Sequence, residues 1–276
     1  MYDPASNSHA NLPSMSAVRG FVGMGRFGGL VCAVGGSDAS YTVLDSCECL
    51  DTANPGAGWS AIPSLGTARH AHAVASTGDT MCAIGGCSDA SCIVDRGYLA
   101  SVECLSQGAA AWVEVAALNT ARENHDAAAV GNVIFVLGGN NGPALSSVEA
   151  LDLSVDGGRW EEKAPMPTAR RNLAVAASGT RLFAVGGVGG DYSQLEIYES
   201  ATDSWSAAAP MPTARYDLAA AIVGNTLFAL GGRDAVGLVG GGATDVAEAY
   251  DIGGGTWSAA EPMGTPREGL AAVAGP

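Results

Sequence analysis

The chain has 276 residues, of which 47% are hydrophobic, 39 are glycine and 15% are charged, and its formal net charge is −15. Such an acidic chain is unsuited to non-specific binding of nucleic acid or anionic membranes, because both partners are themselves negative. No apolar run approaches the roughly 20 residues of a membrane-spanning helix. The composition therefore favours a globular domain of short strands and tight turns.

From the N-terminus onward, every tryptophan precedes an arginine by ten residues. The pairs are Trp59 and Arg69, Trp112 and Arg122, Trp160 and Arg170, Trp205 and Arg215, and Trp257 and Arg267. His9 precedes Arg19 by the same ten residues, which marks a sixth, altered copy. The spacing from one arginine to the next is 50, 53, 48, 45 and 52 residues. A long period of this kind predicts a repeat architecture.

Five of the repeats contain a Gly-Gly doublet at the end of a short apolar run. The doublets are Gly35-Gly36, Gly85-Gly86, Gly138-Gly139, Gly186-Gly187 and Gly231-Gly232. The runs before them are rich in strand-forming residues, and glycine allows the positive φ of a sharp turn. One unit of about four short strands cannot bury both faces of its sheet alone. Units stacked face to face can bury them, with the tryptophan filling the space between.

Two further motifs recur with the repeat. Tyr198 and Tyr250 each lie seven residues before a tryptophan, and the segment Met-Pro-Thr-Ala-Arg occurs at 166–170 and 211–215. Together with the doublets, these motifs resemble the kelch family over essentially the whole chain. The resemblance implies an all-β fold, a β-propeller in which each repeat forms a four-stranded blade around a central channel.

We expect a single domain, residues 1–276, with five complete repeats and an incomplete closing sixth blade. The repeats run approximately over 19–65, 69–118, 122–166, 170–211 and 215–263. The sixth blade would combine 1–13, as the end of a third strand and a fourth strand, with 266–276 as a first strand. It would lack its second strand and much of its third. A five-blade ring is the alternative, and the chain is either a piece of a longer protein or has a truncated closing blade.

All seven cysteines lie in the first 104 residues, at Cys32, Cys47, Cys49, Cys82, Cys87, Cys92 and Cys104. Cys32 and Cys82 occupy the same strand position in adjacent repeats, and we expect both to pack as small core residues. Cys87 and Cys92 flank a loop and could form a disulfide, or bind a metal together with another ligand. The odd count and the lack of a visible secretory signal favour reduced thiols and a cytoplasmic protein.

Motifs for cofactors and metals are weak. The segment 23–28 matches G-x-G-x-x-G, but it falls in the turn between two strands, where no helix can follow to hold a dinucleotide. His72 and His125 each stand three residues after a repeat arginine, so they could share a cation in the channel. Valine or leucine takes that position in the other repeats, which favours packing. We therefore expect no metal site and no cofactor.

The loops at one end of the ring are the candidate site. In an antiparallel four-stranded blade, the fourth-to-first and second-to-third connections emerge on the same side, so residues just after each arginine and each doublet should gather around one channel mouth. In the kelch adaptors that the chain resembles, this mouth binds peptide segments. We expect the binding residues to be Phe21, Asp38, His70, Asp89, Glu123, Asn124, Asn140, Asn141, Arg171, Asn172, Tyr192, Tyr216, Asp217, Arg233, Asp234 and Glu268. Aromatic rings, arginines and amides suit peptide recognition, and the carboxylates favour a mixed or basic peptide over a strongly acidic one.

Two functions are compatible with this resemblance. The favoured one is a protein–protein interaction module that binds a partner protein through a peptide segment, as the substrate-recognition part of a larger adaptor. The alternative is an enzyme similar to the kelch-type sugar epimerases, in which Glu123, Arg171 and Asp217 would supply acid–base and anion-holding groups. A repeat fold does not by itself assign function. We expect neither nucleic acid nor membrane as a partner, and the sequence leaves the oligomeric state open.

Overall fold

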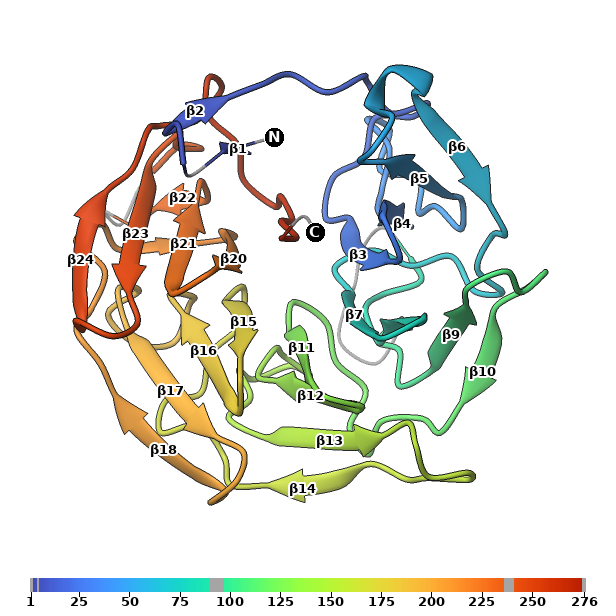
Figure 1. Cartoon of the computed structure of the whole chain (residues 1–276). Coiled ribbons are helices and arrows are strands. Elements are labelled where there is room, and N and C mark those ends of the chain that lie inside the picture. Colours follow the sequence, from blue (N-terminus) through green and yellow to red (C-terminus); the bar gives the residue numbers. More distant parts are fainter. Residues whose placement is uncertain (1, 4, 90–96, 236–240, 275–276) are drawn as a thin grey trace.

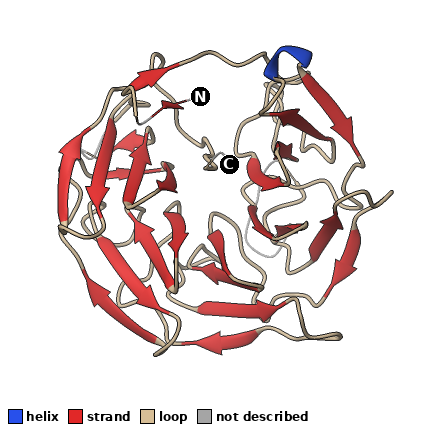
Figure 2. Ribbon diagram, viewed as in Figure 1, coloured by secondary structure: helices blue, strands red, loops and turns tan. Residues whose placement is uncertain are grey.

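The computed structural model describes the chain except for residues 1, 4, 90–96, 236–240 and 275–276. Five antiparallel sheets of four strands stand around a central channel and form a β-propeller (Figure 1). Nearly all of the regular structure is strand, and the short 3-10 helix η1 (Pro55–Ala57) lies in the first blade (Figure 2). The all-β propeller predicted from the repeats is confirmed. In the part of the chain that the structure describes, no helix is long and apolar enough to cross a membrane.

Within each blade the strands follow the chain from the channel outward (Figure 1). Blade one consists of β3 (Gly23–Phe27), β4 (Leu30–Val34), β5 (Cys47–Asp51) and β6 (Trp59–Ile62). Blade two consists of β7 (Ala73–Thr77), β8 (Thr80–Ile84), β9 (Val102–Ser106) and β10 (Val113–Val115). Blade three consists of β11 (Asp126–Val130), β12 (Val133–Leu137), β13 (Val148–Asp152) and β14 (Glu161–Lys163). Blade four consists of β15 (Ala174–Ser178), β16 (Arg181–Val185), β17 (Leu195–Glu199) and β18 (Ser204–Ala207). Blade five consists of β20 (Ala219–Val223), β21 (Thr226–Leu230), β23 (Ala247–Asp251) and β24 (Thr256–Ala259).

The first two strands of every blade are joined by a two-residue turn whose first residue is a glycine at positive φ. These glycines are Gly28, Gly78, Gly131, Gly179 and Gly224, with φ between 51° and 59°. The segment 23–28 therefore forms β3 and the first residue of its turn, and a strand follows it. This agrees with the expectation that the segment is not a dinucleotide-binding motif. Gly23 and Gly25 are needed for packing instead, because a Cβ at either position would collide with the side chain of Val74.

The hydrophobic core is divided among the spaces between successive blades. Alternate residues of a strand face opposite neighbours, so Met81 and Ala83 pack toward blade one, whereas Cys82 and Ile84 pack toward blade three. Among the described residues, four clusters of this kind fill the spaces from blade one to blade five. Because blades two to four bury both faces against their neighbours, and blades one and five bury one face in these clusters, adjacent blades stabilise one another.

Each blade also hydrogen-bonds to the preceding one through its tryptophan. The indole Nε1 donates to a carbonyl oxygen of the segment that follows the preceding fourth strand, across 2.8 or 2.9 Å in every case. The pairs are Trp59 to Pro13, Trp112 to Pro63, Trp160 to Ala116, Trp205 to Ala164, and Trp257 to Ala209. His9 makes the equivalent contact at the sixth position, with a ring nitrogen 3.0 Å from the carbonyl oxygen of Glu261. The altered repeat copy thus keeps the contact between neighbouring blades.

The repeat arginines from Arg19 to Arg215 lie inside their own blades. Each guanidinium donates to the carbonyl of the first doublet glycine, 16 residues later. Each also forms an ion pair with a third-strand glutamate. The pairs are Arg19–Glu48, Arg69–Glu103, Arg122–Glu149, Arg170–Glu196 and Arg215–Glu248. Each glutamate stands two residues before the third-strand leucine or tyrosine, but the repeat spacing alone does not reveal that it pairs with the arginine.

Six positions, not five, surround the channel. A closed circle of backbone hydrogen bonds of 2.8–3.2 Å passes through one residue of each position. Its members are Phe21, Ala71, Asn124, Asn172, Asp217 and Gly269, each donating its amide N–H to the carbonyl of another member. All six have φ between 49° and 57°.

Among the described residues, the sixth position has two short strands. It holds β1 (Tyr2–Asp3) and β2 (Ser8–His9), with the C-terminal segment beside them on the channel side (Figure 1). The prediction that this segment forms a first strand is wrong for its described part, which makes one isolated bridge at Arg267. A strand requires a hydrogen-bonded neighbour, and the second strand that would supply one is missing at this position.

Two disulfides correct the expectation of reduced thiols. Cys32 is bonded to Cys49 and Cys82 to Cys104. In each pair the two cysteines stand directly opposite on the second and third strands of one blade, so the equivalence of Cys32 and Cys82 reflects cross-strand pairing. Cys47 is the free cysteine among the described residues, and burial raises the pKa of its thiol to about 11. The suggested pairing of Cys87 with Cys92 involves a residue outside the described part of the chain.

Candidate binding face at the channel mouth

The loops predicted to form the site do come together at one mouth of the channel. Isolated bridges or short strands pair a residue just after each of the first five repeat arginines with a residue just after the doublet of the same blade. The pairs are Gly20 with Ser37, His70 with Cys87, Glu123 with Asn140, Arg171 with Val188, and Tyr216 with Arg233. The last pair belongs to β19 (Arg215–Tyr216) and β22 (Arg233–Asp234). The antiparallel order of the strands therefore brings both sets of connections to one rim.

Arg171, Tyr192 and Tyr216 lie on the rim loops of blades four and five. All three are partly exposed, and the two tyrosine rings lie 6.0 Å apart. Within the described residues, neither the guanidinium of Arg171 nor either phenol hydroxyl has a hydrogen-bond partner. These side chains therefore offer rigid aromatic area and unused polar groups, the combination that dominates protein recognition sites.

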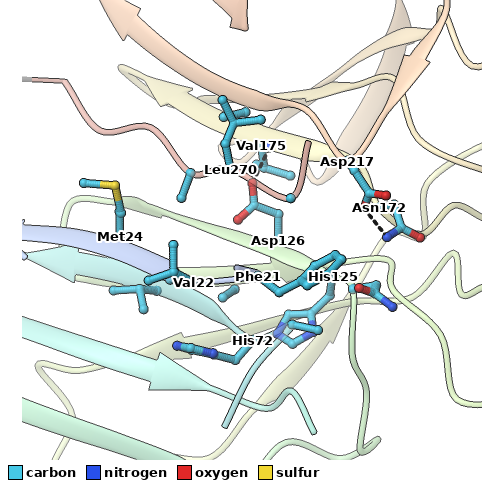
Figure 3. A pocket seen from close by; sticks show the side chains of 18 of the residues that line it. Phe21, Val22, Met24, His72, His125, Asp126, Asn172, Val175, Asp217 and Leu270 are labelled. Carbon is cyan, nitrogen blue, oxygen red and sulfur yellow. Dashed lines mark hydrogen bonds between the residues drawn. The ribbon is translucent and has the colours of Figure 1, made fainter. Parts of the chain in front are cut away.

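Beside them, Asn172 and Asp217 form a polar pair on the backbone circle. The amide Nδ2 of Asn172 donates to Oδ1 of Asp217 across 2.5 Å (Figure 3). Burial raises the pKa of Asp217, and the hydrogen bond from Asn172 only partly offsets that effect. Arg233 and Glu268 form an ion pair of 3.0 Å on the outer rim, with side chains 38% and 36% exposed. An exposed pair of this kind contributes little to stability and can be rearranged by a partner.

Glu123 and Asn140 lie beneath the rim rather than on it. They are only 8% and 3% exposed, and Nδ2 of Asn140 lies 3.3 Å from a carboxylate oxygen of Glu123. The same Nδ2 lies 3.3 Å from the hydroxyl of Tyr98, and Nδ2 of Asn124 lies 3.5 Å from Oδ1 of Asn140. Burial raises the pKa of Glu123 despite its hydrogen bond to Asn140. These contacts make Glu123 and Asn140 supports for the rim.

The remaining predicted residues are spread over the other loops of the mouth. Phe21 meets His70 edge to face at 6.4 Å, and Nε2 of His70 lies 3.0 Å from the carbonyl oxygen of Asp89. The carboxylate of Asp38 accepts the amide hydrogen of Thr42, and this bond lowers the pKa of Asp38. The other two are the exposed Asn141 and the partly buried Asp234.

The channel below the rim contains a cavity of about 130 Å³ and a carboxylate that the sequence analysis missed. Asp126 begins β11 and points into this cavity (Figure 3). Its oxygens accept the amide hydrogens of Ala127 at 2.8 Å and Val175 at 2.6 Å, yet burial raises its pKa to about 7. Four residues after every other repeat arginine, the sequence has glycine or alanine. That departure from the pattern could have identified Asp126.

His72 and His125 serve as packing residues under the doublets. They are 6% and 5% exposed, and a Cβ at Gly35 or Gly85 would lie within 3.0 Å of one of the imidazoles. Burial lowers the pKa of His125 to about 3 and that of His72 well below its usual value, so both rings are neutral. Within the described residues there is no group of three or more His, Cys, Asp and Glu side chains arranged to hold a metal ion.

The three residues of the enzymatic alternative do not line one cavity. Asp217 lines the channel cavity and Glu123 is buried against Asn140, while the charge of the partly exposed Arg171 partly offsets the rise that burial causes in the pKa of both carboxyl groups. A general acid and base must both reach the same substrate. The channel cavity is lined by Asp217 but not by Arg171 or Glu123.

Comparisons with known proteins agree with the repeat and the fold. Residues 121–167, 169–212 and 214–264 each match the Kelch motif, and these matches cover just over half of the chain. The blades and their mouth define a β-propeller of four-stranded repeats. The chain belongs to the kelch-repeat family, whose propellers are commonly protein-interaction modules.

Two individual proteins illustrate the likeness. Kelch-like protein 41a of Danio rerio is 31% identical over 156 residues, which are 56% of this chain and 25% of that protein. The chain thus spans about a quarter of the length of this relative. The solved structure of YjhT superimposes with a TM-score of 0.80 over 95% of this chain and 89% of that one. At 14% identity, that likeness concerns the fold alone.

Proposed function

We propose that this propeller is a protein-interaction module that binds an extended peptide segment of a partner across the channel mouth, as the recognition part of a larger adaptor. The observation that carries the proposal is the unused polar capacity of Arg171, Tyr192 and Tyr216 on a partly exposed rim. A peptide lying over these rings can accept hydrogen bonds from the guanidinium through its backbone carbonyls. The aromatic faces supply contact area with few side-chain rotamers to lose.

The charges around the mouth favour a basic or mixed peptide. Asp38, Asp89, Asp217, Asp234 and Glu268 all lie on its loops. Arg233 is already engaged with Glu268, and the whole chain carries a net charge of −15. A basic segment would be attracted during encounter and could pair with these carboxylates, whereas a strongly acidic segment would be repelled.

The test is a selection of random peptides displayed on phage against the immobilised chain, followed by calorimetry with the selected peptides. We expect Arg171→Ala combined with Tyr216→Ala to weaken binding at least about 30-fold, since two central contacts of about 1–2 kcal/mol each are lost. The melting temperature should stay nearly unchanged. Arg159→Ala is the matched control, because Arg159 is exposed on the β13–β14 connection at the opposite end of its blade.

Three results would contradict parts of this proposal. Undiminished binding by the double variant would remove Arg171 and Tyr216 from the site. Selected peptides that are mostly acidic would contradict the charge preference. A large drop in the melting temperature of the double variant would show that these side chains hold the blades together instead of contacting a partner.

A further inference from the structure

The sixth blade position has an unfilled strand position whose surroundings are already shaped for a strand. Arg267 is the repeat arginine of this position, and its backbone is held as in the other repeats. Its amide donates to the carbonyl of Thr244 at 3.1 Å, and its carbonyl accepts the amide hydrogen of Gly232 at 2.8 Å. The corresponding distances at Arg215 are 2.9 and 3.0 Å. Arg267 therefore has the backbone position of the arginines that form buried ion pairs in the five complete blades.

The side chain of Arg267 nevertheless lacks the partners that the other repeat arginines have. Arg170 and Arg215 are fully buried, each bonded to a doublet carbonyl and to a glutamate. Arg267 is exposed, and its guanidinium makes no hydrogen bond or ion pair with any described residue. A cation that the fold places in a repeat position is thus left open to an incoming carboxylate.

Thr265, two residues before Arg267, also lacks the partner that its counterparts in other blades have. The hydroxyls of Thr168 and Thr213, each two residues before a repeat arginine, donate to the paired glutamates at 3.0 and 2.9 Å. Thr265 has the same place relative to Arg267, but it is exposed and, among the described residues, bonds to no carboxylate. Arg267 and Thr265 together form a carboxylate-binding pair whose geometry the complete blades already use.

The opposite side of this position is incomplete in the same way. The other repeat arginines donate their backbone N–H to the second-to-third loop of the preceding blade, and their C=O accepts a hydrogen bond from the doublet of that blade. In the described structure, Arg19 has neither of these backbone bonds. Met15 is partly exposed, while its counterparts Met166 and Met211 are 2% and 3% exposed against preceding doublets. Blade one therefore presents an unused strand edge toward the sixth position.

All four of these residues line one cavity. Met15 and Arg19 from the start of blade one, and Thr265 and Arg267 from the sixth position, surround a space of about 570 Å³. Trp59 also lines it, with its indole bonded to the carbonyl of Pro13. A polar cation, a hydroxyl, free backbone groups and apolar walls thus face the same space.

We propose that this cavity is a docking site for an extended, acidic segment of a partner polypeptide, which enters as the missing second strand and the start of the third strand of the sixth blade. Its carboxylate would pair with Arg267 and Thr265, and its backbone would bond to the amide and carbonyl of Arg19. Glycines would be needed where the segment turns, because the doublets of the complete blades have φ between 57° and 95°. Five blades of the same chain show the arginine–glutamate pair and two of them also show the threonine contact, and charge complementarity with the exposed Arg267 favours an acidic occupant. The site is separate from the proposed peptide site at the channel mouth.

The probe is a synthetic, C-terminally amidated peptide with the sequence of residues 181–196, which contains the doublet Gly186-Gly187 and Glu196. It ends at Glu196 because Tyr2 already occupies the repeat position of Tyr198. Fluorescence anisotropy of the labelled peptide with the full chain measures binding, and amide exchange locates it. We expect saturable one-to-one binding and slower exchange of the Arg19 amide. Arg267→Gln and a Glu196→Gln peptide should each weaken binding at least 10-fold, without further loss when combined, because they remove the same contact.

Arg159→Gln and the Arg171→Ala, Tyr216→Ala variant are the controls, and both should bind the peptide as the original chain does. Absence of saturable binding, or equal binding by Arg267→Gln, would overturn the proposal. Sedimentation of the chain alone provides a further test. Self-association abolished by Arg267→Gln would show that a second copy fills the site, and would overturn the assignment to a separate partner.

Discussion

Each repeat arginine introduces a full charge into the interior of a blade, so its partner carboxylate matters more than an ordinary surface ion pair. We predict that Glu196→Gln lowers the free energy of unfolding by about 3 kcal/mol, because it leaves the guanidinium of Arg170 buried without its counter-charge. Glu161→Gln is the control, since its pair with Lys163 is exposed and should leave the midpoint unchanged. Urea unfolding measures both. An equally small effect at the two sites would show that the buried pair is not a stabilising feature.

At the same scale, the sequence could place residues on the mouth but could not say which of them a partner can reach. Arg171 and Tyr216 were placed on the rim by their position after the repeat arginine, and both are partly exposed there. Glu123 and Asn140 satisfy the same positional rule, yet they are buried because they bond to each other. Exposure of a loop side chain depends on such pairwise contacts, which the repeat spacing does not encode.

In the Gly-Gly doublet, the first glycine packs against the following blade and the second against the start of its own blade. We predict that Gly187→Ala costs at least about 3 kcal/mol, because its φ is 94° and a Cβ would lie 2.8 Å from the carbonyl oxygen of Arg171. Gly179→Ala should cost only about 1 kcal/mol, since its φ of 59° is the only obstacle and no atom lies within 4 Å. Urea unfolding of both variants separates backbone strain from steric collision. Equal costs would mean that collision contributes nothing.

Strands and turns were the most predictable elements, because apolar runs, doublets and turn glycines recur in every repeat. The exceptions arise where a partner element decides the outcome. The segment after Arg267 has the pattern of a first strand, but without a second strand beside it no ladder forms. The disulfides of Cys32 with Cys49 and Cys82 with Cys104 were also missed. Their partners are adjacent only across a strand pair, so spacing along the chain could not reveal them.

At the scale of the whole molecule, the ring is held at its closing point by few contacts. We predict that deletion of residues 268–276 increases amide exchange of Phe21 at least 10-fold, because this amide donates to the carbonyl of Gly269. The amide of Asn172 lies three blade positions away from Phe21 and donates to the carbonyl of Asn124. Its exchange rate should change less than twofold. Exchange followed by NMR measures both rates. A similar acceleration at both amides would show that the complete blades depend on closure of the circle.

The circle of six backbone hydrogen bonds also affects the electric field in the channel. Its peptide groups point head to tail around the mouth, so their dipole components along the circle cancel instead of adding as they do along a helix axis. Both the N–H and the C=O of every member are engaged within the circle, which leaves no backbone donor to attract an anion. Full charges on side chains therefore outweigh this circle in the potential along the channel axis. Asp217 at the rim and Asp126 below it make that axis favourable for cations whenever the two carboxyl groups are ionised.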